Sequence, residues 1–199
     1  MSPENTPDQP RGGRAPVTTK AQLGHVGLQL FFERGFERTT VDDIAAAAGI
    51  GRRTFFRYFA SKNDLPWGDF DGLVEAMRVR LASVPQDVPP LAALREAVLA
   101  FNRFPDVADE DHRRRMTLLL GTPELIAHST LRFADWRRAV ADFVADRLGE
   151  DPGGLRPQTI AWTYLAASIA AYERWLVDGT SLQDLLAEAM DLIEGAFRP

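Results

Sequence analysis

The stretch TVDDIAAAAGIGRRTFFRYFASKNDL, residues 40–65, decides how the rest of the chain is interpreted. Thr40, followed three residues later by Asp43, forms a capping box, in which each residue satisfies a backbone N–H of the other. This motif predicts a helix over residues 41–48, and Gly49 is placed to end it.

A second short helix is expected directly afterwards. Gly51 can act as its N-cap, the helix is expected over residues 52–58, and Ser61 is placed to cap the next one. Two helices joined by a turn of three or four residues that contains glycine are typical of a helix-turn-helix, whose second helix enters a DNA major groove. The stretch therefore predicts a DNA-binding element.

The second helix has an apolar side and a polar side. Its phenylalanines are expected to pack on the first helix, in a small core of Phe55, Phe59, Val41, Ile44, Ala45 and Ala48. The outward side carries groups suited to contact with phosphate and base edges, namely Arg52, Arg53, Thr54, Phe56 and Arg57. From these residues alone, the alternative is an arginine-rich solvated helix in an ordinary bundle.

The order of residues in this stretch resembles the DNA-binding head of TetR-type transcriptional regulators. The resemblance rests on TTVDDIA at residues 39–45, AGI at 48–50, TFFRYF at 54–59 and SKNDL at 61–65. It implies an all-helical homodimer that represses until a small molecule binds in a divergent second domain. It also implies that phosphate is contacted by Thr40, Tyr58 and Lys62, and that the groove is faced by Arg52, Arg53, Thr54, Phe56 and Arg57.

Two positions depart from the family pattern. Gly51 stands where serine is common, so one helix-capping contact is expected to be missing. Phe56 stands where the family often has tyrosine, which leaves apolar contact, such as with a thymine methyl, in place of a hydroxyl. The base preference at Phe56 is therefore open.

Composition argues against several classes of protein. The chain has no cysteine for disulfides or thiolate sites, and no apolar run near the roughly 20 residues that span a bilayer. The first 16 residues lack the apolar core of a signal peptide, so a cytoplasmic protein is expected. Residues 1–62 carry nine Lys and Arg against six Asp and Glu, and the remainder carries 14 against 22, which is a basic head on an acidic body.

Apolar spacing divides the chain into an arm, a head and a body, and it predicts an all-α fold. Residues 1–16, rich in Pro and Gly, are expected to be disordered, either inert or with Arg11 and Arg14 reaching DNA. Residues 17–62 are expected to form the helix-turn-helix domain, and residues 63–199 the ligand-binding and dimerisation domain. The remaining helices are expected over residues 18–34, 61–81, 91–103, 109–120, 123–148 with a break near His128 and Ser129, 157–177 and 181–197.

Pro66 and Gly68 fall inside the expected helix over residues 61–81, where both disfavour helical structure. One interpretation is that packing of Trp67, Phe70 and Leu73 overrides them. The other is a softened hinge between head and body.

The last two helices indicate a homodimer. The final helix has an apolar stripe of Leu182, Leu185, Leu186, Ala189, Ile193 and Phe197, and the helix before it offers Ala166, Ala167, Ala170 and Ala171 for close approach. Intramolecular core packing is the alternative for both sets. A dimer would read a palindrome in double-stranded DNA, with half-sites about 34 to 36 Å apart or multiples of that.

We recognise no catalytic or metal-binding pattern, so no enzyme, cofactor or metal is expected. His112, near Asp109 and Asp111, is interpreted as part of a solvated helix start. The body supplies side chains suited to a cavity for a small apolar effector, namely Phe101, Phe104, Met116, Leu119, Leu120, Phe133, Trp136, Trp162 and Tyr172. A charged end of the ligand is assigned to Arg137, with Arg113, Arg114, Arg115 and Arg138 as further candidates. Ordinary core packing is the alternative for most of the apolar residues.

The body also resembles one group of the TetR type, the regulators of the mycofactocin redox-cofactor system of actinobacteria. This resemblance rests on LPWGDF at residues 65–70, AFNRFP at 100–105, HRRRM at 112–116 and HSTLR at 128–132. It implies a repressor of mycofactocin biosynthesis genes whose effector is a long-chain acyl-CoA. Two alternatives are a dimeric DNA-binding protein that needs no ligand and a helical protein-interaction module that does not bind DNA.

Overall fold

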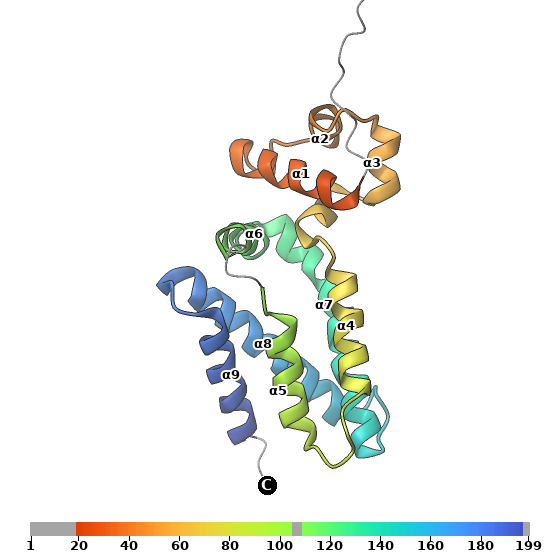
Figure 1. The fold of residues 1–199 in the computed structure, drawn as a ribbon, viewed down its shortest axis with the longest axis vertical. Coiled ribbons are helices and arrows are strands. Elements are labelled where there is room, and N and C mark those ends of the chain that lie inside the picture. Colours follow the sequence, from red (N-terminus) through yellow and green to blue (C-terminus); the bar gives the residue numbers. More distant parts are fainter. Residues whose placement is uncertain (1–18, 105–108, 197–199) are drawn as a thin grey trace, which may run out of the picture. The chain divides into compact units, whose positions relative to one another are not determined.

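The computed structural model describes residues 19–104 and 109–196, which form helices and no strand (Figure 1). The expected all-α class is therefore confirmed. The α-helices are α1 (Lys20–Arg34), α2 (Val41–Ala47), α3 (Arg52–Tyr58), α4 (Phe70–Ala82), α5 (Pro90–Phe101), α6 (Asp109–Gly121), α7 (Pro123–Leu148), α8 (Leu155–Asp178) and α9 (Leu182–Ala196). The predictions for Arg11, Arg14 and Phe197 fall outside the described residues.

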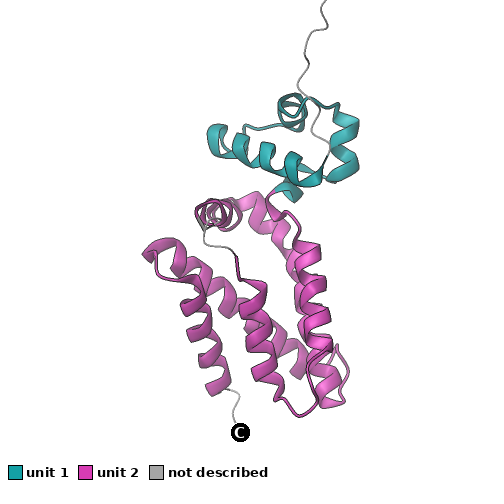
Figure 2. Cartoon of the chain, viewed as in Figure 1, with its two compact units in different colours: residues 1–65 teal, residues 66–199 magenta. Residues whose placement is uncertain are grey.

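The chain divides into two compact units, residues 1–65 and residues 66–199 (Figure 2). The first unit contains α1, α2 and α3, and the second contains α4 to α9. A 3-10 helix, η1 (Lys62–Trp67), crosses the division. Within the described residues, none of the helices combines the length and apolar character that a membrane crossing requires.

The first unit has the local structure that its sequence predicts. Thr40 Oγ1 accepts a hydrogen bond from Asp43 N at 3.1 Å, and the Asp43 carboxylate accepts one from Thr40 N at 2.9 Å, which completes the capping box. Gly49, with a φ of 69°, turns the chain after α2. No side chain caps the start of α3 at Gly51. Helix, turn and helix are thus confirmed at the expected residues.

The core of the first unit is built from apolar side chains of α1, α2 and α3. Ile44 of α2 and Phe55 of α3 are fully buried, as is Leu23 of α1, and Phe59 is buried beside Phe55 at 5.8 Å between ring centroids. The expected inward face of α3 is confirmed, because its apolar residues close the space between α1 and α2.

The side chain of Leu65 packs on α1 at Gly27, in space that the side chain of any larger residue would occupy. Leu65 is fully buried, and a Cβ atom built at Gly27 would lie 2.7 Å from its Cδ1 atom. A Cβ atom at Gly24, one turn earlier, would meet only ordinary contacts at 3.8 and 3.9 Å. Gly27 therefore sets how closely the end of the first unit packs on α1.

In the second unit, α8 packs against both α7 and α9, while α4 packs against α5 and α7. The centre of this bundle is formed by fully buried side chains, among them Leu94, Leu125, Tyr164, Trp175 and Leu186. The guanidinium of Arg147 holds the loop after α4 by donating to the carbonyls of residues 84, 85, 86 and 88, at 2.8 to 3.3 Å.

The single helix expected over residues 61–81 is a wrong prediction. The 3-10 helix ends at Trp67, Gly68 takes a φ of 58° in the left-handed region, and α4 begins at Phe70. Pro66 lacks the N–H that a continuous helix would use, and side-chain packing does not override it. The helical structure is therefore interrupted next to the boundary of the two units.

One further expectation, the break in α7, is corrected in the second unit, and the small and apolar residues of α8 and α9 divide between core and surface. Helix α7 runs without a break through His128 and Ser129, and the Ser129 hydroxyl donates to Ile126 O at 2.6 Å within the helix. The apolar stripe of α9 faces mainly inward, because Leu182, Leu186 and Ile193 are buried in the core. In α8, Ala171 is buried and Ala166 and Ala170 are exposed.

Gly24→Ala and Gly27→Ala form a matched test of the α1 packing. Alanine favours a helix interior over glycine by about 1 kcal/mol, so Gly24→Ala should raise the free energy of unfolding by about 0.5 to 1 kcal/mol. Gly27→Ala should lower it by about 1 to 3 kcal/mol, because Leu65 is buried and has no free space to enter. Urea unfolding measures both changes, and equal effects would contradict the assigned close contact.

Candidate functional site

The exposed face of α3 is basic. Arg52, Arg53 and Arg57 are exposed, Phe56 is 45% exposed, and Thr54 is half-buried. Phe56 packs edge-on to the buried Phe55, with 5.4 Å between ring centroids. The structure therefore brings the residues predicted to face a DNA groove together on one side of a short helix.

Within this face, two arginines have partners on the protein. Arg52 Nη1 donates to Asp42 Oδ2 at 2.8 Å, and its guanidinium lies 5.4 Å from the Phe56 ring centroid. Arg57 Nη2 donates to Tyr58 Oη at 3.2 Å. Arg53 forms no ion pair with any described residue. Arg53 is thus the arginine of this face whose charge is least compensated.

The three residues predicted to contact phosphate have different surroundings. Thr40 is engaged in the capping box, whose hydrogen bonds lower the pKa of Asp43. Tyr58 is half-buried beside Arg57. Lys62 Nζ donates to Phe36 O at 3.0 Å and Thr39 O at 3.4 Å, so it ties the turn before α2 to the segment after α3.

The second unit contains a cavity of about 110 Å³ bounded by α4, α5, α6, α7 and α8. Eight of the apolar and aromatic residues predicted from the sequence line it: Phe101, Phe104, Met116, Leu119, Leu120, Phe133, Trp136 and Tyr172. Arg115, one of the candidates for a charged ligand end, also lines it, whereas the prediction missed Pro66, Trp67, Phe70, Leu73, Asn102, His112, Ser129, Leu165, Ser168 and Ile169. Several of these lie at the broken start of α4, where the sequence indicated packing but gave no sign of a cavity.

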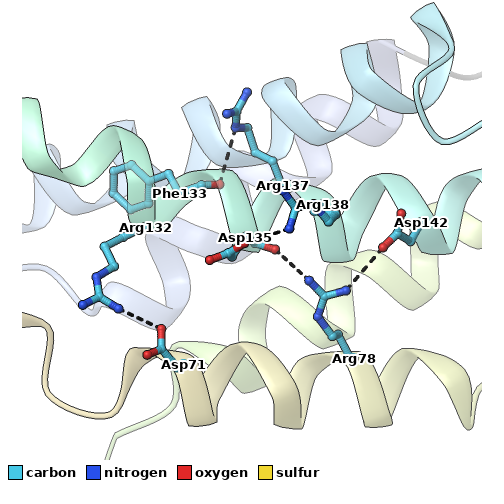
Figure 3. Close-up of polar contacts among 8 residues, drawn as sticks. All are labelled: Asp71, Arg78, Arg132, Phe133, Asp135, Arg137, Arg138 and Asp142. Atoms are coloured by element: carbon cyan, nitrogen blue, oxygen red, sulfur yellow. Dashed lines mark hydrogen bonds and ion pairs between the residues drawn. The ribbon is translucent and has the colours of Figure 1, made fainter.

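Arg137 and Trp162, also predicted for the ligand site, do not line the cavity. The Arg137 guanidinium lies 3.5 Å from the Trp162 ring centroid, and Trp162 is 53% exposed on the outside of α8. Figure 3 shows Arg137 pointing away from α4. Its neighbour Trp136 faces the cavity, and successive residues of a helix point about 100° apart.

The consecutive arginines of α6 differ in their contacts. Arg113 Nη1 donates to Trp175 O at 2.7 Å, and its guanidinium lies 4.2 Å from the Trp175 ring centroid. Arg114 is exposed. Of the arginines proposed for a charged ligand end, Arg115 is the one that lines the cavity.

A hydrogen-bonded chain fixes part of the cavity wall. Asn102 Nδ2 donates to Val98 O at 2.8 Å, which orients the amide, and Tyr172 Oη donates to Asn102 Oδ1 at 2.8 Å. Because the hydroxyl proton of Tyr172 is donated to Asn102, Tyr172 Oη can only accept from His112 Nε2, which lies 3.0 Å away. His112 carries its proton on Nε2.

His112 is not the solvated residue that its acidic neighbours in the sequence suggested. Its ring lies 4.0 Å from that of Phe104 and 5.6 Å from that of Trp175, measured between centroids. Burial, and secondly the charge of Arg115, lower the pKa of His112 from 6.5 to about 4. The imidazole is therefore neutral at pH 7. No group of acidic and histidine side chains among the described residues is arranged to hold a metal ion.

Polar contacts join α4 and α7 beside the cavity (Figure 3). Arg132 Nη1 donates to Asp71 Oδ1 at 2.9 Å. Arg78 donates to Asp142 Oδ2 at 3.3 Å and to Asp135 O at 3.2 Å. The first turns of α4, which help to line the cavity, are thereby fastened to α7.

Family models match both units. A model described as bacterial regulatory proteins of the tetR family matches residues 25–65, and a model described as the MftR C-terminal domain matches residues 88–198. MftR of Mycobacterium tuberculosis, whose name refers to transcriptional regulation of mycofactocin biosynthesis, is 44% identical over 188 residues. The matched region covers 94% of this chain and 95% of that relative.

Solved structures share the fold. SmeT, the repressor of the multidrug efflux pump SmeDEF of Stenotrophomonas maltophilia, has a TM-score of 0.61 at 21% identity, over 90% of each chain. FadR of Thermus thermophilus, a repressor solved in complex with lauroyl-CoA, has a TM-score of 0.54 at 23% identity. That match covers 91% of this chain and 96% of the FadR chain.

The buried neutral state of His112 predicts a pH dependence of stability. Between pH 4 and 6.5 the unfolded chain binds a proton at His112 that the folded protein does not, so acidification favours unfolding. We expect this residue alone to lower the free energy of unfolding by about 1 to 2 kcal/mol between pH 7.5 and 5.5. Urea unfolding of the wild type and His112→Gln at both pH values tests this, and an identical pH dependence would contradict it.

Proposed function

Because the chain belongs to the TetR family of bacterial transcriptional regulators, with the MftR type of C-terminal domain, we propose that it is a ligand-released repressor. In this proposal it binds a palindromic operator as a homodimer, controls mycofactocin-related genes, and is released by a small apolar effector of the long-chain acyl-CoA class. The observation that carries it is a single chain with a basic helix-turn-helix in one unit and an apolar cavity in the other.

DNA binding is proposed for the exposed face of α3. Its arginines can donate to guanine or phosphate, and Thr54 and Phe56 stand beside them for contact with base edges. Residues 1–62 carry a net charge of +3, whereas the whole chain carries −5. The affinity should therefore depend strongly on salt, since phosphate neutralisation releases bound counterions.

Homodimerisation is proposed through the last two helices. The outer side of α8 exposes Trp162, Ala166, Ala170 and Val177, spaced by four or seven residues as on one side of a helix. Leu192 of α9 is 71% exposed. A symmetric pair of heads suits the proposed function, because two half-sites read a longer palindrome than one helix-turn-helix can.

An apolar effector is proposed for the cavity. Its lining is mainly aromatic and aliphatic, and FadR of Thermus thermophilus binds lauroyl-CoA on a related fold. At about 110 Å³ the cavity is smaller than the roughly 300 to 1,000 Å³ of most ligand sites, so an acyl chain must widen it. Widening would move α4, which begins next to the break at Gly68. This supplies a physical route from ligand to DNA-binding unit.

We expect Arg53→Ala to weaken operator binding by about 5- to 100-fold, which corresponds to roughly 1 to 3 kcal/mol for one base or phosphate contact. The measurement is fluorescence anisotropy with DNA from upstream of the chain's own gene and its neighbours, at two salt concentrations. Arg156→Ala is the matched control, because Arg156 is an exposed arginine of the other unit. Equal operator affinities for the wild type and both variants would contradict the assignment of α3 as the helix that contacts DNA.

We expect acyl-CoAs to stabilise the protein and release it from DNA, with the effect growing with chain length. At 100 times the dissociation constant, a ligand that binds only the folded state adds about 2.7 kcal/mol to the free energy of unfolding. A thermal-shift titration with acyl-CoAs of increasing length, run beside the anisotropy assay, measures both effects. DNA binding without stabilisation or release would favour a regulator that needs no ligand.

A further inference from the structure

Two buried donors in the cavity wall lack an acceptor. Arg115 Nε and Trp67 Nε1 are both shielded from solvent, and neither donates to any of the described residues. Both side chains line the cavity. Buried N–H groups are nearly always paired in folded proteins, so two unpaired donors in one wall call for an explanation.

The two donors belong to one part of the wall. Gly68 follows Trp67 directly, and a Cβ atom at Gly68 would lie 3.1 Å from Arg115 Nη1. The Arg115 guanidinium therefore rests against the backbone next to Trp67, in space that a larger residue would take. The Trp67 ring is held edge-on by Phe70 at 5.1 Å and Phe133 at 5.4 Å, measured between centroids. Both donors are thus positioned in advance.

The other polar groups of the wall already have partners, and the hydroxyls of Ser129 and Ser168 donate to backbone carbonyls within their own helices. His112 donates to Tyr172, which donates to Asn102, which donates to a backbone carbonyl. His112 is neutral, so Arg115 contributes the positive charge of this wall. Burial lowers the pKa of Arg115, and Asp111 acts in the opposite direction. Arginine nevertheless stays protonated in proteins, so its donors have no way to become acceptors.

A wall with donors and a positive charge selects a ligand with an acceptor. We propose that Arg115 and Trp67 form a subsite that hydrogen-bonds the acyl oxygen of an apolar-chain ligand, while the aromatic lining holds the chain. This rests on the proposed function, since it assumes that the cavity receives an effector. The same oxygen chemistry is offered by the thioester carbonyl of an acyl-CoA and by the carboxylate of a free fatty acid. A thioether has no oxygen at that position, and an alcohol has only a neutral hydroxyl, which is a weaker acceptor than a carboxylate.

The test compares ligands that differ in that oxygen. Isothermal titration of the full chain would use lauroyl-CoA, its thioether analogue S-dodecyl-CoA with a methylene in place of the carbonyl, laurate and dodecanol. We expect the wild type to prefer lauroyl-CoA over S-dodecyl-CoA, or laurate over dodecanol, by about tenfold or more. The pair that shows the preference identifies the source of the acyl oxygen.

Variants assign the preference to the subsite. Arg115→Met keeps an unbranched side chain and removes the donors, and Trp67→Phe keeps a smaller aromatic ring and removes the N–H. In either variant we expect the preference to fall to less than threefold, with affinity for S-dodecyl-CoA or dodecanol nearly unchanged. Arg114→Met is the matched control on α6, because Arg114 is exposed, and it should retain the full preference.

The outcomes separate this subsite from the proposed effector class. Tight binding of all four ligands with no preference in the wild type would overturn the subsite and leave an apolar effector in place. A preference that survives both Arg115→Met and Trp67→Phe would overturn it as well. No binding of any of the four would overturn the subsite together with the proposed effector class. Trp67→Phe keeps the test decisive if Arg115→Met does not fold.

Discussion

Edge-to-face aromatic contacts at the start of α4 are the constraint on which the second unit depends. Trp67 and Phe70 pack on each other and on Phe133 of α7, and Phe70 also meets Phe101 of α5, with ring centroids 5.1 to 6.4 Å apart. The ion pairs of Figure 3 lie beside them but are partly solvated, and such pairs contribute little. The buried rings therefore fix α4 on the bundle, and the same rings close the cavity.

The DNA-binding unit could be predicted almost residue by residue, because its signals are local. The capping box at Thr40 and the glycine at 49 each fix a helix end through neighbours within three or four residues. Phe55 and Phe59 could then be assigned to the core between the helices of the first unit. The close approach of Leu65 to Gly27 could not be predicted in the same way, because it joins residues far apart in the sequence.

The second unit could be predicted as helices and as a set of candidate cavity residues, but the position of the cavity could not. Three consecutive arginines look alike in the sequence, yet Arg113 stacks on Trp175, Arg114 is exposed and Arg115 lines the cavity. Which one points inward depends on the rotation of α6, and packing against α7 and α8 sets that rotation. Arg137 and Trp162 were wrongly assigned to the cavity because the rotation of α7 and α8 about their axes could not be predicted either. The helix α7 continues through Ser129, whose hydroxyl donates to a carbonyl of the same helix.

The ion pair between Arg52 and Asp42 means that the basic face of α3 already holds an anion of its own. The carboxylate lies 2.8 Å from the guanidinium, and both side chains are more than half exposed. Any phosphate that approaches Arg52 must compete with this carboxylate, so it gains only the difference between two anionic partners. In the proposed complex with DNA, an ion pair as exposed as this one would reduce the gain from a phosphate contact by up to about 1 kcal/mol. Arg53, which has no ion-pair partner among the described residues, is therefore the arginine of this face from which a phosphate contact would gain most.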